Sequence, residues 1–200
     1  MNINLYLVRH GQSVANLDPT EYMRTDDSLI ALTNVGKEQC VLVAKDLNWR
    51  LKANEQTVAL CSSPYKRAIS SAEIIQCNLD FDTNIYIVDE LKERKLGSLV
   101  SEIDWSVSLT SKDIAENPKL HWDYRPKDGE SYADTYARAA QFYNDLVGSC
   151  EEHNISNVIV VSHYVFLQTL IMVIDNLSQE DWPFMEPIDN AEIIFRTIGK

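Results

Sequence analysis

The sequence predicts an α/β fold: a three-layer sandwich in which a mostly parallel central sheet has helices on both faces. Short apolar runs of strand length recur along the chain, and stretches with helical spacing of apolar residues separate most of them. Strands that alternate with helices favour parallel pairing, because the chain must cross over between neighbouring strands. A length of 200 residues fits one domain, and neither an internal repeat nor a linker divides the chain. We therefore expect a single domain over residues 1–200.

Three short apolar runs predict strands in the first half of the chain, over residues 5–8, 58–61 and 85–88. A helix is expected between the first two strands, starting near Leu32 with Thr33 as its N-cap. Its apolar residues recur at helical spacing, as Val35, Leu42, Val43, Leu47 and Leu51.

A second helix is expected to begin with Ser63 as its N-cap and Pro64 at its first position. Residues 99–128 follow the third strand without a regular pattern, and we expect a short helical excursion there that covers a cleft. A long helix is expected from Ser131, because apolar and aromatic residues then form one broad helical face.

The most hydrophobic strand is expected over residues 158–161, and it ends at Ser162 and His163. A helix over 165–175 and a final strand near 193–195 complete the predicted fold.

Charge and composition are those of an ordinary soluble globular protein with an acidic surface. Lys and Arg number 18 and Asp and Glu 30, so the formal net charge is −12. Such a surface repels nucleic acid and anionic membranes, which bind through clustered cations. It also repels small phosphate esters at long range, so any phosphate site must be a local basic pocket.

The cysteines indicate neither disulfides nor a zinc site, because they lie far apart and form no Cys-x-x-Cys pair. We expect all four to be reduced core thiols: Cys40, Cys61, Cys77 and Cys150. Polar Asn2 and Asn4 interrupt the start of the chain, so no signal peptide is expected. No apolar stretch approaches the ~20 residues that span a bilayer. The cytoplasm is the expected compartment.

Two histidines stand at the ends of predicted parallel strands. His10 follows the run 5–8 and His163 follows the run 158–161, so both side chains are expected at one rim of the sheet. Arg9 precedes His10, and Arg67 lies in the first turn of the second helix, whose backbone amides also favour an anion. Two imidazoles, two guanidinium groups and a helix N-terminus at one rim predict a phosphate site.

The motifs around these residues resemble those of the histidine phosphatase (phosphoglycerate mutase-like) superfamily, and they occur in the family's order over nearly the whole chain. They are Leu7-Val8-Arg9-His10-Gly11-Gln12-Ser13 with Asn16, Leu32-Thr33 with Gly36 and Gln39, Ser62-Ser63-Pro64 with Arg67 and Ala68, Leu91-Lys92-Glu93 with Gly97, Gly129-Glu130-Ser131, and Val161-Ser162-His163. The resemblance implies a phosphoglycerate mutase-like fold and a phosphohistidine intermediate.

The resemblance also assigns roles at the rim. His10 would attack phosphorus through one ring nitrogen while the other nitrogen is held as a donor. Arg9 and Arg67 would bind the phosphoryl oxygens, and His163 would donate a further hydrogen bond. Asn16 would contact phosphate through its amide, although a turn-forming role is an alternative. This arrangement needs neither metal nor cofactor.

Glu93 matches the family's acid position, four residues before Gly97. A carboxyl group enclosed by a cleft can keep the proton that the leaving oxygen requires. Two alternatives remain open: Glu90 could be the acid, or the charged residues 90–95 could form a solvated loop.

Two departures from the family pattern affect turnover and substrate choice more than fold. Tyr164 stands where a glycine usually follows the second histidine, and Val100 and Ser101 stand where a second glycine is usual past Gly97. A glycine lets the backbone approach an anion closely, which a tyrosine does not.

Chain length favours a phosphatase within the superfamily. Only 35 residues, 94–128, separate Glu93 from Gly129, which is short beside the insertions that shield the intermediate in glycolytic mutases. The predicted function is therefore a metal-independent phosphomonoesterase that forms phosphohistidine on His10. The alternatives are a phosphoglycerate-type phosphomutase and a catalytically weak binding or scaffold protein, which Tyr164 would support.

Overall fold

The computed structural model describes residues 2–51, 57–102 and 116–199, in which five strands form one sheet with the order β3-β2-β4-β1-β5. β1 pairs in parallel with β4, β4 with β2, and β2 with β3, whereas β5 runs antiparallel to β1. The mostly parallel sheet is thus confirmed. The strands are β1 (Ile3–Arg9), β2 (Val58–Ser62), β3 (Ile85–Ile87), β4 (Asn157–Ser162) and β5 (Ile193–Ile198).

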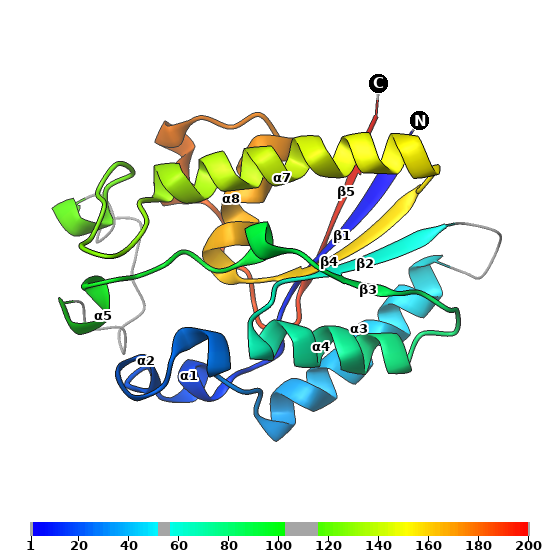
Figure 1. Ribbon diagram of the computed structural model, residues 1–200, viewed down its shortest axis with the longest axis horizontal. Coiled ribbons are helices and arrows are strands. Elements are labelled where there is room, and N and C mark those ends of the chain that lie inside the picture. The colour runs from blue at the N-terminus through cyan, green and yellow to red at the C-terminus, as the bar shows by residue number, and fades with distance from the viewer. Residues whose placement is uncertain (1, 52–56, 103–115, 200) are drawn as a thin grey trace.

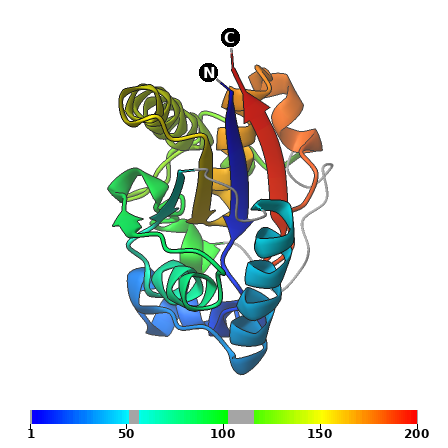
Figure 2. The same cartoon turned by 90° about the vertical axis from the view of Figure 1, so that its right-hand side faces the viewer.

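Helices cover both faces of this sheet, which confirms the three-layer sandwich (Figures 1 and 2). Long helices lie on each side: α3 (Asn34–Leu51) and α4 (Lys66–Cys77) on one face, α7 (Tyr132–His153) and α8 (Tyr164–Ile174) on the other. Alternate residues of β1 point into the two cores: Leu5 and Leu7 pack with α7 and α8, whereas Tyr6 and Val8 pack with α3 and α4. This alternation is what a strand buried on both faces requires.

Short elements lie beyond the carboxyl ends of the parallel strands, where α1 contacts α2 and α2 contacts α5 (Figure 1). The short elements are α1 (Val14–Leu17), α2 (Glu21–Arg24), η1 (Asp27–Leu29), η2 (Asp89–Leu91), α5 (Leu99–Glu102), η3 (Pro118–Leu120) and η4 (Gln179–Phe184). The predicted excursion over 99–128 contains α5 and η3, anchored by the buried side chains of Leu99 and Leu120, and its residues 103–115 lie outside the described part.

Of the two predicted helix caps, one is confirmed and one is wrong. The Thr33 hydroxyl accepts the Gly36 N–H at 3.0 Å. The helix expected from Ser131 also begins there, and Ser131 forms a reciprocal capping box with Asp134. The second helix begins at Lys66 rather than at position 64, and the residue at its N-cap position, Tyr65, forms no side-chain cap. The Ser63 hydroxyl is engaged elsewhere, as described below.

The expected burial of three side chains is also wrong. Val35 and Leu42 are 52% and 62% exposed. They lie seven residues apart, which places both on the same side of α3, and that side faces away from the core. Cys77, at the end of α4, is exposed, whereas the other three cysteines are buried and all four are free thiols. Within the described residues, no helix combines the length and the apolar character that crossing a membrane demands.

Candidate active site

His10 and His163 meet at the rim formed by β1 and β4. Arg9 is in register with Ser162, so the residue that follows each strand reaches the same edge. The two imidazole rings lie with their centroids 5.2 Å apart, and both side chains are buried. The predicted convergence of the two histidines is therefore what the structure shows.

The ring of His10 is oriented by the backbone. Its Nδ1 lies 2.8 Å from the Gly11 carbonyl oxygen, which can only accept, so Nδ1 carries the proton and Nε2 a lone pair. A side chain at Gly11 would meet the Gly36 carbonyl oxygen at 2.3 Å, so this turn requires glycine. Burial lowers the pKa of His10 well below its usual value, and the charges of Arg67 and Arg9 act in the same direction. A neutral imidazole with a lone pair on Nε2 can act as a nucleophile.

Arg67 is directed at that nitrogen from the first turn of α4. Its Nε donates to His10 Nε2 at 3.2 Å, and its side chain is 1% exposed. Its Nη1 donates to both the carboxylate and the carbonyl oxygen of Asp27, at 2.7 and 2.6 Å. Asp27 was not predicted from the sequence, because it reaches the site from η1 across 40 residues of chain.

Arg9 lies at the same rim, with its Nη1 bonded to the Ile188 carbonyl oxygen at 2.6 Å. Its Nε is buried and has no hydrogen-bond partner within the part of the chain that the structure describes. The guanidinium carbon lies 5.0 Å from the ring centroid of Tyr164, so the unusual tyrosine packs against this cation.

The two ring nitrogens of His163 have different surroundings. Its Nε2 lies 2.8 Å from the Ser63 hydroxyl, and its buried Nδ1 has no hydrogen-bond partner among the described residues. The Ser63 hydroxyl accepts the Tyr65 N–H at 3.3 Å and can donate its own proton to Nε2. In the tautomer in which it does so, Nδ1 carries a proton and can donate to a bound phosphoryl group. Burial lowers the pKa of His163 as well, which favours the neutral ring.

Glu93 is half-buried, and backbone N–H groups bind its carboxyl group. Its carboxylate accepts three backbone N–H groups: Arg94 at 2.8 Å, Val165 at 3.1 Å and Phe166 at 3.2 Å. Burial raises the pKa of Glu93, while these amides and the charge of Arg67 oppose the shift. Burial thus favours the protonated form of this carboxyl group, which is the property expected of the acid.

A pocket of about 380 Å³ opens beside Glu93. Its other lining residues include Tyr65, whose ring contacts that of His163, and Glu90. Cations and anions both line it, so the pocket suits a polar group attached to the phosphate.

The side chain of Asn16 forms hydrogen bonds within the protein. Its Oδ1 accepts the N–H and the hydroxyl of Ser13, at 2.8 and 2.9 Å, and the amide of Asn190 at 3.1 Å. These contacts match the turn-forming interpretation, and a contact with phosphate stays a prediction.

A metal-binding group is not found among residues 2–51, 57–102 and 116–199, where no three His, Cys, Asp or Glu side chains are placed to hold an ion. Metal independence therefore stays a prediction that chelation can test.

Comparison with known proteins identifies the family. The model of the histidine phosphatase superfamily (branch 1) matches residues 5–198. A 2,3-bisphosphoglycerate-dependent phosphoglycerate mutase of Methylobacterium sp. is 30% identical over 96% of this chain and 90% of its own length. The phosphoglycerate mutase-like protein AT74 of Arabidopsis thaliana is 26% identical over 98% of this chain, which spans 65% of that protein.

A solved structure shows the same fold. The mycobacterial glucosyl-3-phosphoglycerate phosphatase superposes with a TM-score of 0.69 at 23% identity, over 96% of this chain and 90% of that one. The expected phosphoglycerate mutase-like architecture is confirmed, and the chain belongs to the histidine phosphatase superfamily.

Proposed function

We propose that this protein is a metal-independent phosphomonoesterase that hydrolyses a small phosphorylated substrate through a phosphohistidine on His10. The observation that supports it most is the state of His10: its Nδ1–H is fixed by a carbonyl, and Arg67 faces its Nε2. The net charge of −12 favours a small phosphate ester over nucleic acid or a membrane surface.

The first half-reaction transfers the phosphoryl group to the enzyme. Nε2 of His10 attacks phosphorus, and the bond between phosphorus and the leaving oxygen breaks. Arg9, Arg67 and the Nδ1–H of His163 stabilise the charge on the phosphoryl oxygens. The leaving oxygen takes a proton from Glu93, which becomes a carboxylate.

The second half-reaction returns the enzyme to its starting state. A water molecule attacks the phosphorus of phosphohistidine while the Glu93 carboxylate accepts one of its protons. The bond between phosphorus and Nε2 breaks, inorganic phosphate forms, and both His10 and Glu93 regain their initial protonation.

A phosphomutase is the second candidate, because a mutase is among the relatives at 30% identity. In a mutase the phosphohistidine would pass its phosphoryl group to a substrate hydroxyl instead of water. The short segment between Glu93 and Gly129 favours hydrolysis, since it leaves less chain to exclude water. A role in binding alone is less well supported, because His10, His163 and Arg67 converge although Tyr164 replaces glycine.

The test is to trap the intermediate. The purified protein is mixed with a ³²P-labelled alkyl phosphate and quenched in alkaline detergent, where phosphohistidine is stable. We expect acid-labile label on His10, none in His10→Ala, and normal labelling in His153→Ala, which changes an exposed histidine at the end of α7. Full turnover by His10→Ala would refute the proposal. Transfer of label to phosphoglycerate faster than to water would indicate the mutase.

A further inference from the structure

The segment that contains Glu93 has no regular structure of its own. Residues 92–96, between η2 and α5, belong to neither helix nor strand. Backbone groups in such a segment need partners from elsewhere in the protein, because unpaired buried carbonyl and N–H groups are costly. The partners therefore decide where the Glu93 carboxyl group lies.

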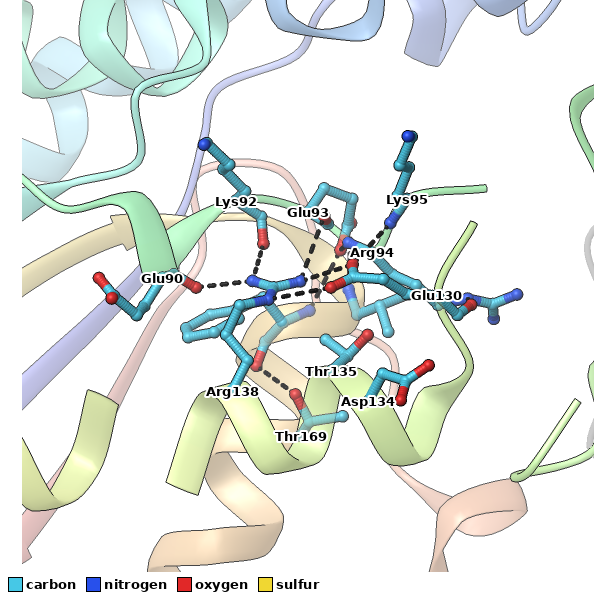
Figure 3. Close-up of polar contacts among 12 residues, drawn as sticks. Glu90, Lys92, Glu93, Arg94, Lys95, Glu130, Asp134, Thr135, Arg138 and Thr169 are labelled. Carbon is cyan, nitrogen blue, oxygen red and sulfur yellow. Dashed lines mark hydrogen bonds and ion pairs between the residues drawn. The ribbon is translucent and has the colours of Figure 1, made fainter. Parts of the chain in front are cut away.

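Arg138 of α7 supplies hydrogen-bond donors for carbonyl groups at the start of this segment (Figure 3). Its Nη1 donates to the carbonyl oxygens of Glu90 and Lys92, at 2.6 and 2.7 Å, and its Nη2 reaches the Glu93 carbonyl oxygen at 3.4 Å. One guanidinium group thus contacts three carbonyls within four consecutive residues. A planar group with five fixed donors can make these contacts together, which an ammonium group cannot.

Glu130 holds Arg138 in place and extends the same set of contacts. Its carboxylate accepts from Arg138 Nε at 3.2 Å and from Nη2 at 2.8 Å, so the pair is bidentate. One of its oxygens also accepts the Lys95 N–H at 2.9 Å, and its own N–H donates to the Lys95 carbonyl at 2.8 Å. The positive charge of Arg138 is matched by Glu130, so its influence on Glu93 acts through geometry.

The same guanidinium group lies against the element that binds the Glu93 carboxylate. Its carbon is 5.3 Å from the ring centroid of Phe166, and the Phe166 N–H donates to that carboxylate. Arg138 therefore contacts the backbone of Glu93 on one side and the start of α8 on the other.

We infer that Arg138 is a positioning residue for the reaction: it fixes the Glu93 carboxyl group against the leaving oxygen through its hydrogen bonds to the carbonyl groups of residues 90–93. This inference rests on the proposed function, because it gives Glu93 the role of general acid. A displacement of about 1 Å is enough to lower the rate of such a step by about 10²-fold.

The test compares two leaving groups in Arg138→Lys and Arg138→Gln. We expect kcat/KM for an alkyl phosphate to fall by about 10–100-fold, and kcat/KM for p-nitrophenyl phosphate, whose leaving group needs no proton, to fall by less than about 3-fold. Competitive inhibition by vanadate should stay within about 2-fold of wild type, since its donors Arg9, Arg67 and His163 lie on other elements. Arg138→Lys keeps the positive charge beside Glu130, so it can still be used for the test if Arg138→Gln does not fold.

Arg196→Lys is the matched control, because Arg196, on β5, forms a comparable bidentate pair with Asp175 at the end of α8, at 2.9 and 2.8 Å. It should leave kcat/KM unchanged for both substrates. Equal losses on both substrates in folded Arg138→Lys, or no loss on either, would overturn the inference.

Glu93→Gln separates this failure from failure of the proposed function. If Glu93→Gln is selective for the alkyl substrate and Arg138→Lys is not, only the positioning role is wrong. If Glu93→Gln shows no selectivity, the acid role itself fails. In the double variant, Arg138→Lys should add no selectivity to that of Glu93→Gln, because both changes act on one proton transfer.

Discussion

Replacing Glu93 by Gln removes the proton donor while keeping the size of the side chain. An alkyl phosphate expels a strongly basic alkoxide, whereas p-nitrophenyl phosphate expels a weak base that leaves almost unaided. We expect kcat/KM for alkyl substrates to fall by about 10²–10⁴-fold, the usual contribution of general acid catalysis. The aryl substrate should lose much less. kcat/KM is the parameter to measure, because it reports phosphorylation of His10 and excludes the later hydrolysis.

The structure also predicts the stability cost of this substitution. Oε1 of Glu93 accepts the N–H groups of Arg94 and Phe166, and Oε2 accepts that of Val165. A glutamine has one oxygen, so its amide group must face at least one of these N–H groups and cannot accept from it. One buried N–H left unpaired costs about 1–3 kcal/mol. In a chain of 200 residues each kcal/mol lowers Tm by about 2–4 °C, which calorimetry resolves.

Glu90→Gln makes the same chemical change three residues earlier and tests the alternative acid. If Glu93 is the acid, Glu90→Gln should not make the loss on alkyl phosphates larger than the loss on the aryl phosphate. Equal losses on both substrates in Glu93→Gln would mean that Glu93 only maintains the site, and selectivity appearing in Glu90→Gln would assign the acid to Glu90.

Four further outcomes follow from the same geometry. Activity should survive exhaustive treatment with EDTA, and a loss restored by a divalent ion would contradict the phosphohistidine mechanism. For alkyl substrates, kcat/KM should decline as pH rises through the raised pKa of Glu93, because the acid loses its proton, and this decline should be absent for p-nitrophenyl phosphate. The free energy of unfolding should be highest above pH ~6.5 and fall below it, because unfolding lets His10 and His163 take up protons that the folded state does not bind. For two protons its limiting slope is about 2.7 kcal/mol per pH unit, and urea unfolding between pH 7 and 5 measures it. Ser63→Ala should shift the ¹⁵N signals of the His163 ring toward a tautomer mixture and slow turnover, whereas unchanged signals would exclude a role for Ser63.

Much of the fold and the rim was predictable because buried strands and amphipathic helices each have a recognisable pattern of apolar residues. The runs before His10 and His163 are continuously apolar, as strands buried on both faces are, and parallel pairing then brings their ends together. The same reasoning placed Arg67 in the first turn of α4. It overestimated the burial of Val35 and Leu42, since an apolar residue at helical spacing still has to meet a partner in space.

Polar contacts between distant elements have no such period. Asp27 meets Arg67 across 40 residues, Ser63 meets His163 across 100, and Arg138 meets the Glu90 carbonyl across 48. Several of these contacts use backbone groups, which every residue possesses, so the identity of the residue gives no sign of them. The signal available for Ser63 was misleading, because a serine before a proline and an apolar run is also what a helix cap looks like.

Such contacts decide the chemistry that each residue performs, and the two histidines demonstrate it. Both are buried, both are held neutral by burial and by the same two arginines, and their rings lie 5.2 Å apart. Burial and charge therefore cannot distinguish the nucleophile from the donor. The distinction comes from the second ring nitrogen. A carbonyl oxygen at Nδ1 of His10 forces that nitrogen to donate and leaves a lone pair on Nε2, which can attack phosphorus. A hydroxyl at Nε2 of His163 can donate to it and leave a proton on Nδ1, which can only stabilise charge that has already developed. A carbonyl cannot change its role and a hydroxyl can, so the tautomer of the donor histidine depends on the orientation of the Ser63 hydroxyl, whereas a backbone carbonyl fixes the tautomer of the nucleophile.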